Sequence, residues 1–361
     1  MLKIIDRYII RNFLGTFFLT ITLILSIAVV FDISEKIDDF ISEGATASEI
    51  IWDYYLNFVI YYGNLFSAII VFIATIFFTS RMAANTELVA VLTGGVSFRR
   101  MLWPYFVAAT LLAAINFTLS NYVIPATNVD RINFRRAYID NNEDSRFKNI
   151  HRQIIPGHMV YFESYNTNRD AGYLFSYEVF HNHSLIYKLK ADFIRFDTSN
   201  NKWQLDKYSI REIDSITGKE TLSQGNRMDT TLPMDPSEIV PKLHTIEMMN
   251  TPQLNEFIEE EKIRGSENIN FYLIEKYRRS SFPAATYILV LIGLSLSSQK
   301  KRGGIGINIA IGLLMGISYI FLMQISTTFS TLGNLSPLLA VWLPNIIFSV
   351  IALYMYYIAP K

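Results

Sequence analysis

The chain has 361 residues, of which 51% are hydrophobic and 18% are charged, whereas about a quarter of the residues of a typical soluble protein are charged. This excess of apolar residues predicts a membrane protein. The net charge is zero, which disfavours a nucleic-acid-binding protein. The absence of cysteine excludes disulfide bonds and thiolate metal sites.

Membrane spans follow from the distribution of charge along the chain. A helix that crosses a bilayer needs about 20 apolar residues, and five long stretches are free of Asp, Glu, Lys, Arg and His. A break at 331–337 that contains Gly, Asn and Pro divides the last stretch between two helices. The six predicted spans, three on each side of a long insertion, are about 12–33, 56–79, 102–124, 280–298, 305–327 and 337–358.

The orientation is predicted from Lys and Arg in the short loops, which favour the cytoplasmic side. The loop at 32–53 is acidic, with Lys36 as its one cation. Both termini and the segment 81–100 are therefore expected in the cytoplasm, and residues 130–275 in the periplasm between the membrane halves 1–129 and 276–361. The cations that decide this are Lys3, Arg7, Arg11, Arg81, Arg99, Arg100, Lys300, Lys301, Arg302 and Lys361.

The insertion has the pattern of a β domain followed by one helix. Runs rich in Tyr, Phe, Val and Ile alternate with polar turns, which indicates an antiparallel sandwich or jelly roll. Thr251 and Pro252 are typical of a helix start, so a helix is expected at about 252–264. The fold class is thus an α-helical membrane protein with an inserted periplasmic antiparallel β domain. The predicted strands are 158–165, 172–180, 185–196, 203–213 and 227–232.

Motifs for catalysis or for a cofactor are absent from the sequence. The chain lacks the G-x-x-x-x-G-K-[ST] loop that binds ATP phosphates. His181 and His183 form a pair without an evident third metal ligand, so surface or core histidines are favoured over a metal site. The spans also lack the ionisable residues that ion-driven transporters need. We expect neither an enzyme nor a cofactor, and we expect any transport work to be powered by a partner.

Cations on the predicted outer side depart from the orientation rule. They stand within a turn or two of spans three and four. Arginine binds phosphate groups bidentately, so a lipid with anionic phosphates is a candidate ligand. Pairing with Asp130, Asp140, Glu267 or Glu275 is the alternative. The candidate lipid-phosphate residues are Arg131, Arg135, Arg136, Lys276, Arg278 and Arg279.

The segment between spans two and three predicts a short amphipathic helix that ends at a glycine pair. Leu88, Val91 and Leu92 fall at positions i, i+3 and i+4 and form one apolar ridge beside Glu87. A carboxylate next to such a ridge suits docking into a groove of a partner. The alternative is that Glu87 caps its own helix or pairs with Arg81. The candidate coupling residues are Glu87, Leu88, Val91, Leu92 and Gly94.

Four stretches, in this order and spacing, resemble the LptF/LptG family of lipopolysaccharide-export permeases across essentially the whole chain. The opening and the segment 31–38 look closer to the G type. The family often has basic residues in that segment, whereas this chain has mostly acidic ones around Lys36. The stretches are Ile5-Asp-Arg-Tyr-Ile9, Glu87-Leu-Val-Ala-Val-Leu-Thr-Gly-Gly-Val-Ser97, Asn133-Phe-Arg-Arg136 and Tyr277-Arg-Arg-Ser-Ser-Phe-Pro283.

The resemblance implies a bacterial inner-membrane permease that extracts lipopolysaccharide from the outer leaflet and passes it on through a β-jelly-roll domain. It also implies several partners. These are a second related permease in a heterodimer, a dimer of cytoplasmic ATPase subunits that docks around Glu87, a single-span companion protein and a periplasmic bridge protein.

Gly312 and Gly316 stand four residues apart on the fifth span, a spacing that lets membrane helices approach closely. Because the resemblance implies that the fifth and first spans line the seam where lipid enters, these glycines are candidates for helix packing or a lateral gate. A competing interpretation of the chain is an envelope scaffold or sensor whose β domain binds a partner. A membrane acyl- or glycosyltransferase is disfavoured, since no catalytic constellation is evident.

Overall fold

The computed structural model describes residues 3–139, 146–167, 169–182, 184–214, 217–239, 245–266, 268–298 and 304–359. The chain divides into two compact units, which are taken one at a time below. The helical unit comprises Met1–Asn141, His244–Leu254 and Asn270–Lys361, and the sheet unit comprises Asn142–Leu243 and Asn255–Ile269.

Six helices of the described residues are long and apolar enough to cross a membrane, and an antiparallel β domain is inserted after the third, as the sequence predicts. The described strands of this domain form one six-stranded sheet. The first is α1 (Ile4–Ser42). The second runs on through α2 (Ala47–Glu49), η1 (Ile50–Tyr55) and α3 (Leu56–Ala84), and the third through α5 (Phe98–Thr118), η2 (Leu119–Val123) and α6 (Ile124–Tyr138). The others are α9 (Ile269–Ser297), α10 (Gly304–Thr331) and α11 (Pro337–Ile358).

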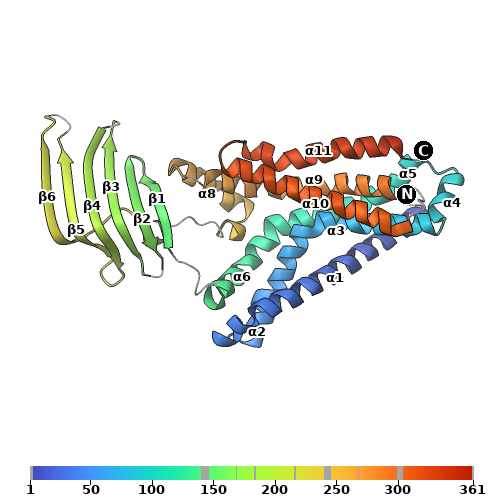
Figure 1. Cartoon of the computed structure of the whole chain (residues 1–361), viewed down its shortest axis with the longest axis horizontal. Coiled ribbons are helices and arrows are strands. Elements are labelled where there is room, and N and C mark those ends of the chain that lie inside the picture. The colour runs from blue at the N-terminus through green and yellow to red at the C-terminus, as the bar shows by residue number, and fades with distance from the viewer. Residues whose placement is uncertain are drawn as a thin grey trace. The chain divides into compact units, whose positions relative to one another are not determined.

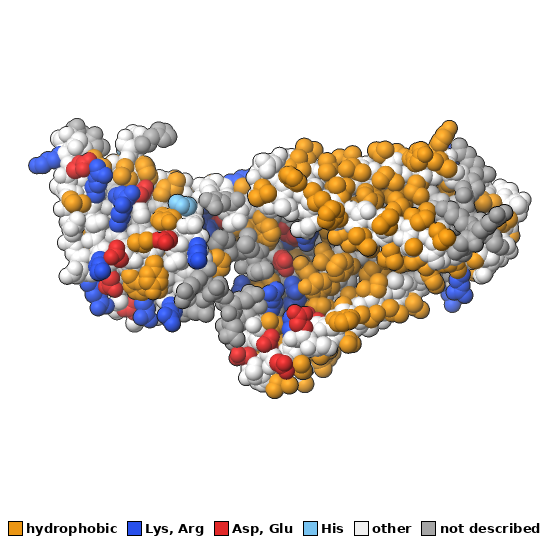
Figure 2. All heavy atoms as spheres, viewed as in Figure 1, with side chains coloured by type: hydrophobic (Ala, Val, Ile, Leu, Met, Phe, Trp, Pro, Cys, Tyr) orange, Lys and Arg blue, Asp and Glu red, His pale blue; other side chains and the backbone are white. Residues whose placement is uncertain are grey.

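The short helix α4 (Glu87–Thr93) joins α3 to α5 at one end of the bundle. The helix α1 begins and α11 ends at this same end, and α2 lies at the opposite end (Figure 1). We call these the α4 end and the α2 end. Figure 2 shows hydrophobic side chains over a broad area of the helices, which is the surface expected of a protein in lipid.

The helices differ in how far their apolar residues are enclosed. In the most apolar 18 residues of each helix, 61% are buried for α9, against 22% for α10 and 17% for α1. Ile9 and Phe13 of α1 nevertheless join a buried cluster with Leu88 of α4 and Tyr105 of α5. The helix α9 therefore forms the centre of the bundle, whereas α1 packs through one face and leaves its other apolar face open to lipid or to a second protein.

The sheet unit is a meander in which each strand pairs with the next along the chain. Its buried face holds Phe162, Phe175, Leu189, Trp203 and Leu205. The jelly roll that the resemblance implies would need crossing connections between two sheets, whereas the described strands follow chain order in one sheet. The strands are β1 (Arg146–Ile155), β2 (His158–Asn166), β3 (Ala171–His181), β4 (Ser184–Asp197), β5 (Lys202–Ile213) and β6 (Glu220–Thr230).

The sequence does not predict β1, and the predicted strand 227–232 covers only the end of β6. Arg152 interrupts the apolar alternation of β1 between Ile150 and Ile154. Three short helices follow the sheet, and the last begins where Thr251 and Pro252 predict a helix start. They are α7 (Pro236–Ile239), η4 (Thr245–Met248) and α8 (Thr251–Ile263).

Candidate functional site

The α4 helix presents a different face from the one that the sequence predicts. Leu88 is 1% exposed and packs in the cluster that contains Ile9 and Phe13 of α1. Val91 and Leu92 are half-buried, and Leu92 packs against the same cluster. Leu88 and Leu92 of the expected apolar ridge thus turn inward, because burying Leu88 anchors the helix to its own bundle. The outward side chains include Val89, which is 46% exposed.

Glu87 is held at the start of α4 by two hydrogen bonds. The Tyr8 hydroxyl donates to its Oε2 at 2.9 Å, and the side-chain amide of Asn85 donates to its Oε1 at 3.1 Å. Among the described residues no ion pair joins Glu87 to Arg81. Gly94 follows the helix in an exposed position, and its N–H donates to the Ala90 carbonyl at 3.0 Å. Glu87 is therefore half-exposed and oriented by α1.

Three of the candidate arginines meet at the α2 end in a cluster with two carboxylates. Arg131 is 6% exposed; its Nη2 lies 3.3 Å from Glu247 Oε2, and its Nε donates to Asn128 Oδ1 at 2.7 Å. Its guanidinium stacks 4.3 Å from the ring centre of Tyr61, whose hydroxyl donates to Glu247 at 3.3 Å. Arg131 is thus a buried, paired residue rather than a free phosphate ligand.

The other two arginines of this cluster lie on α9. Arg279 is 7% exposed and lies 3.5 Å from Glu275, and it donates to the Ile246 carbonyl of η4 at 3.2 Å. Arg278 pairs with Glu275 at 3.3 Å, but 31% of its side chain is exposed. The alternative of pairing with Glu275 therefore applies to both residues, and of the three arginines in the cluster Arg278 is the one with an open side.

The remaining candidates for lipid contact lie outside this cluster. Arg136 is exposed, and Arg135 and Lys276 are half-buried. The Lys276 ammonium lies 6.0 Å from the ring centre of Tyr277. The structure thus separates the six predicted cations into two that are enclosed, Arg131 and Arg279, and four that solvent or a ligand reaches.

A crevice of about 410 Å³ runs between α3, α9 and α10, and Arg278 is one of the residues that line it. Phe66, Ile69 and Phe282 supply apolar walls, and Gln324 supplies a polar group. An apolar crevice with a few placed polar groups is the usual form of a ligand site. Here it suits a hydrocarbon chain with an anionic group beside it.

The two glycines of α10 face α3. A Cβ atom at Gly312 would meet the end of the Ile76 side chain, whereas one at Gly316 would lie 3.8 Å from Ile69 and Phe72, an ordinary contact. Gly312 therefore marks a close approach of α10 to α3 within this chain.

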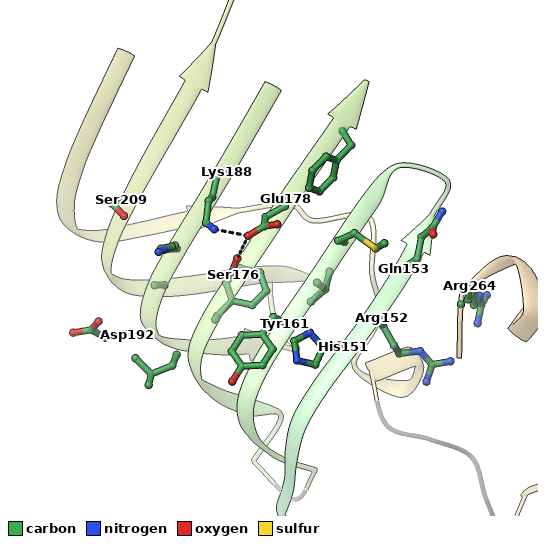
Figure 3. Close-up of a pocket in the computed structure, with 18 of the residues that line it drawn as sticks. His151, Arg152, Gln153, Tyr161, Ser176, Glu178, Lys188, Asp192, Ser209 and Arg264 are labelled. Atoms are coloured by element: carbon green, nitrogen blue, oxygen red, sulfur yellow. Dashed lines mark hydrogen bonds and ion pairs between the residues drawn. The ribbon is translucent and has the colours of Figure 1, made fainter. Parts of the chain in front are cut away.

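The polar face of the sheet holds an open groove of about 810 Å³ (Figure 3). His151, Tyr161, Ser176 and Lys190 occupy paired positions on β1 to β4, and the rings of His151 and Tyr161 lie 4.5 Å apart. The groove therefore presents a row of polar and aromatic side chains across neighbouring strands.

Next to this row, Lys188 lies 2.5 Å from Glu178, and Ser176 donates to Glu178 at 3.0 Å. Burial raises the pKa of Glu178, but these hydrogen bonds outweigh it and hold the pKa below its usual value. Glu178 is therefore an ionised partner of Lys188 at neutral pH.

No group of three or more His, Asp or Glu that could hold a metal ion occurs within the described part of the chain. His183 and His244 lie outside the described residues, as do Asp140, Glu267, Lys300, Lys301, Arg302 and Lys361.

These features define a multi-pass helical membrane protein with an inserted β domain, a partly enclosed arginine cluster and an apolar crevice beside it. The sequence matches the family described as lipopolysaccharide export system permease LptF/LptG over residues 7–358. The chain belongs to this family, whose members are permeases of the bacterial inner membrane, and the match covers the F and G types together. A comparison with curated proteins finds no match.

Proposed function

We propose that the chain is a permease subunit of an ATP-driven exporter that extracts lipopolysaccharide from the outer leaflet and passes it to a periplasmic bridge. The crevice between α3, α9 and α10 is the observation that supports this most. Its apolar walls suit acyl chains, and Arg278 offers a half-open guanidinium to an anionic phosphate. Lys276 on the same helix and Arg136 on α6 are further cations that a ligand can reach.

In this proposal the α4 end lies in the cytoplasm and the α2 end in the periplasm. Exposed cations at the α4 end support it, namely Lys3, Arg7, Arg11, Arg81 and Arg99. ATP is hydrolysed by a cytoplasmic ATPase dimer that docks at α4 and contacts Glu87 and Val89, so the permease itself is not an enzyme. The open faces of α1 and α10 suit a second related permease, and the sheet unit suits the companion and bridge proteins.

Lipid capture is tested by photo-crosslinking from a benzoylphenylalanine at Gln324, which lines the crevice. We expect Arg278→Glu to lower the crosslink to lipopolysaccharide at least about tenfold, since a hydrogen bond to a charged group contributes about 1.5–3 kcal/mol. Arg99→Glu, the same change at an exposed site of the α4 end, is the matched control and should leave the crosslink unchanged.

Arg131→Glu should behave differently from Arg278→Glu. It places a carboxylate against Glu247 in an enclosed site, and breaking a buried pair is strongly destabilising, so loss of folded protein is expected rather than loss of lipid alone. An Arg278→Glu protein that is folded and crosslinks to lipid as the parent does would remove Arg278 from the lipid contact. A parent protein that gives no crosslink from position 324 would remove the crevice from the lipid path.

A further inference from the structure

The first two turns of α1 contact both sides of the α4 segment through polar side chains. Asp6 is 2% exposed, and the Arg100 guanidinium donates to it at 2.6 Å. Two residues further on, the Tyr8 hydroxyl donates to Glu87 at 2.9 Å. Glu87 begins α4 and Arg100 lies in the first turn of α5. The two contacts therefore bracket the whole of α4.

The helix α4 depends on these contacts for its position. It has seven residues, and helices this short are not stable by themselves. Thr86, which precedes it, has a φ of +62°, a conformation that is unfavourable for a β-branched residue and that persists only where the surroundings impose it. The surroundings are Leu88, buried against Ile9 of α1, and the hydrogen bond from Tyr8.

Glu87 retains room for a second partner. An ionised carboxylate has about four acceptor positions, and the hydrogen bonds from Tyr8 and Asn85 use one on each oxygen. Tyr8 is itself 47% exposed, so the bond lies at the surface where a partner reaches it. The same carboxylate can thus accept a partner's hydrogen bond while α1 holds it.

The helix α1 is also the span with the smallest enclosed share of its apolar residues, 17%. Phe18, Leu23 and Phe31 are each more than half exposed. Moving the start of α1 therefore disrupts fewer packing contacts within this chain than moving the central helix α9 would. Of the six spans, α1 is the one best placed to move with α4.

We propose that Tyr8 is the positioning residue for Glu87, and that the Tyr8–Glu87 and Asp6–Arg100 contacts join α4 to α1 as one mechanical unit. A push on α4 then moves the open apolar face of α1. The source of this push, a cytoplasmic ATPase, rests on the proposed function. The link itself belongs to the permease alone and is measurable without a partner.

The link is tested by the distance between spin labels at Ile4→Cys and Val89→Cys in the full chain in lipid nanodiscs. Both sites are exposed, and the chain has no native cysteine. We expect one narrow distance distribution, and we expect Tyr8→Phe to broaden it, because this change removes only the hydroxyl. The matched control is Tyr287→Phe, which removes the hydroxyl that donates to Thr110 at 3.1 Å elsewhere in the bundle. Equal distributions in the parent and Tyr8→Phe would overturn the link.

The coupling role is tested with the ATPase subunits bound, by measuring ATPase binding, ATP hydrolysis and lipid released per ATP. For Tyr8→Phe we expect unchanged binding and about two- to tenfold less lipid per ATP, the range that a hydrogen bond worth about 0.5–1.5 kcal/mol gives.

The two measurements separate the possible failures. If no ATPase binds the parent protein, the proposed function fails, and with it the coupling role. If the spin-label distances broaden while the lipid released per ATP stays at the parent value, the link exists but carries no work, and the inference is overturned. A proportional loss in the Tyr287→Phe control would likewise overturn it, since the effect would not be specific to Tyr8.

Discussion

Single residues of α4 divide between those that hold the helix and those that a partner can reach. Leu88 belongs to the first kind, because its side chain is enclosed by α1 and α5 residues. Val89, its neighbour, belongs to the second kind. The spacing of apolar residues predicts which side chains share a face, but it does not say whether that face meets the same chain or another one.

This division predicts that truncating Leu88 mainly lowers stability, whereas truncating Val89 mainly lowers ATPase binding. Leu88→Ala should lower the free energy of unfolding by about 2–5 kcal/mol, the usual cost of removing a buried leucine side chain. Val89→Ala should change it by no more than about 0.5 kcal/mol, as is usual at the surface, while weakening ATPase binding if the partner docks there. Denaturant titration of the purified protein in micelles measures both. Equal stability of the two variants would contradict the burial of Leu88.

The arginine cluster contains two carboxylates that differ in how far along the chain they lie from the arginines they pair with. Glu275 stands four residues before Arg279 and three before Arg278, so its pairing is visible as a helical spacing. Glu247 is 116 residues from Arg131, and nothing local in the sequence points to it. A prediction from charge alone therefore counts Arg131 as a free cation, whereas the fold supplies its counter-charge.

Helix packing in the bundle depends on which element each small residue faces. The spacing of Gly312 and Gly316 predicts a face for close packing, and in the structure both glycines face side chains of α3. The role of these glycines in a lateral gate stays a prediction. The contact with Ile76 makes only Gly312 critical, since Gly316 has room for a methyl group.

Three variants test this contact. Gly312→Ala should lower the Tm, because the new Cβ forces the end of the Ile76 side chain aside, and overpacking costs about 1–3 kcal/mol. Gly316→Ala, the matched control, should leave the Tm unchanged or raise it, since Ala favours a helix more than Gly does. Adding Ile76→Val, which removes the clashing Cδ1 atom, should restore the Tm of Gly312→Ala. Failure of that rescue would show that the contact is not the cause.

The strands of the sheet unit differ in how clearly the sequence predicts them. The alternation in β4 is plain, with Leu189 and Ala191 buried and Lys190 exposed. In β1 the buried face includes Arg152, whose side chain pairs with Glu261 of α8 at 2.5 Å. This charged residue obscures the alternation of apolar and polar residues that would identify β1 as a strand. The fold supplies the counter-charge for this arginine from a carboxylate 109 residues away.

At the scale of the whole molecule, the number of spans fixes which segments share a side of the membrane. One span, Phe98–Tyr138, separates the α4 segment from the sheet unit. Asn85 precedes this span and Asn200 follows it, and both are exposed. If all six helices cross the bilayer, these two residues must lie on opposite sides.

Single cysteines at Asn85→Cys and Asn200→Cys test this topology against a background free of cysteine. In cells with a permeable outer membrane, an impermeant maleimide should label position 200 at once. Position 85 should react only after the inner membrane is opened. Labelling of both from the same side would contradict the six-span arrangement.

The sequence by itself determines the features that depend on neighbouring residues. Runs without charge fix the six spans, because a backbone in lipid must satisfy its hydrogen bonds within one helix of about 20 residues. Helix starts and most strands follow for the same reason, since caps and alternation act over a few residues. The family resemblance, now confirmed over residues 7–358, also rests on such local stretches.

Only the tertiary structure decides which side chains remain free. It turns Leu88 inward, pairs Arg131 with Glu247, and places Gly312 against Ile76. It also connects Tyr8 to Glu87 across 79 positions of the chain. Each of these depends on burial or on a counter-charge brought by a distant segment. The free energy of a charged or apolar side chain is set by its surroundings, and those surroundings exist only once the chain has folded.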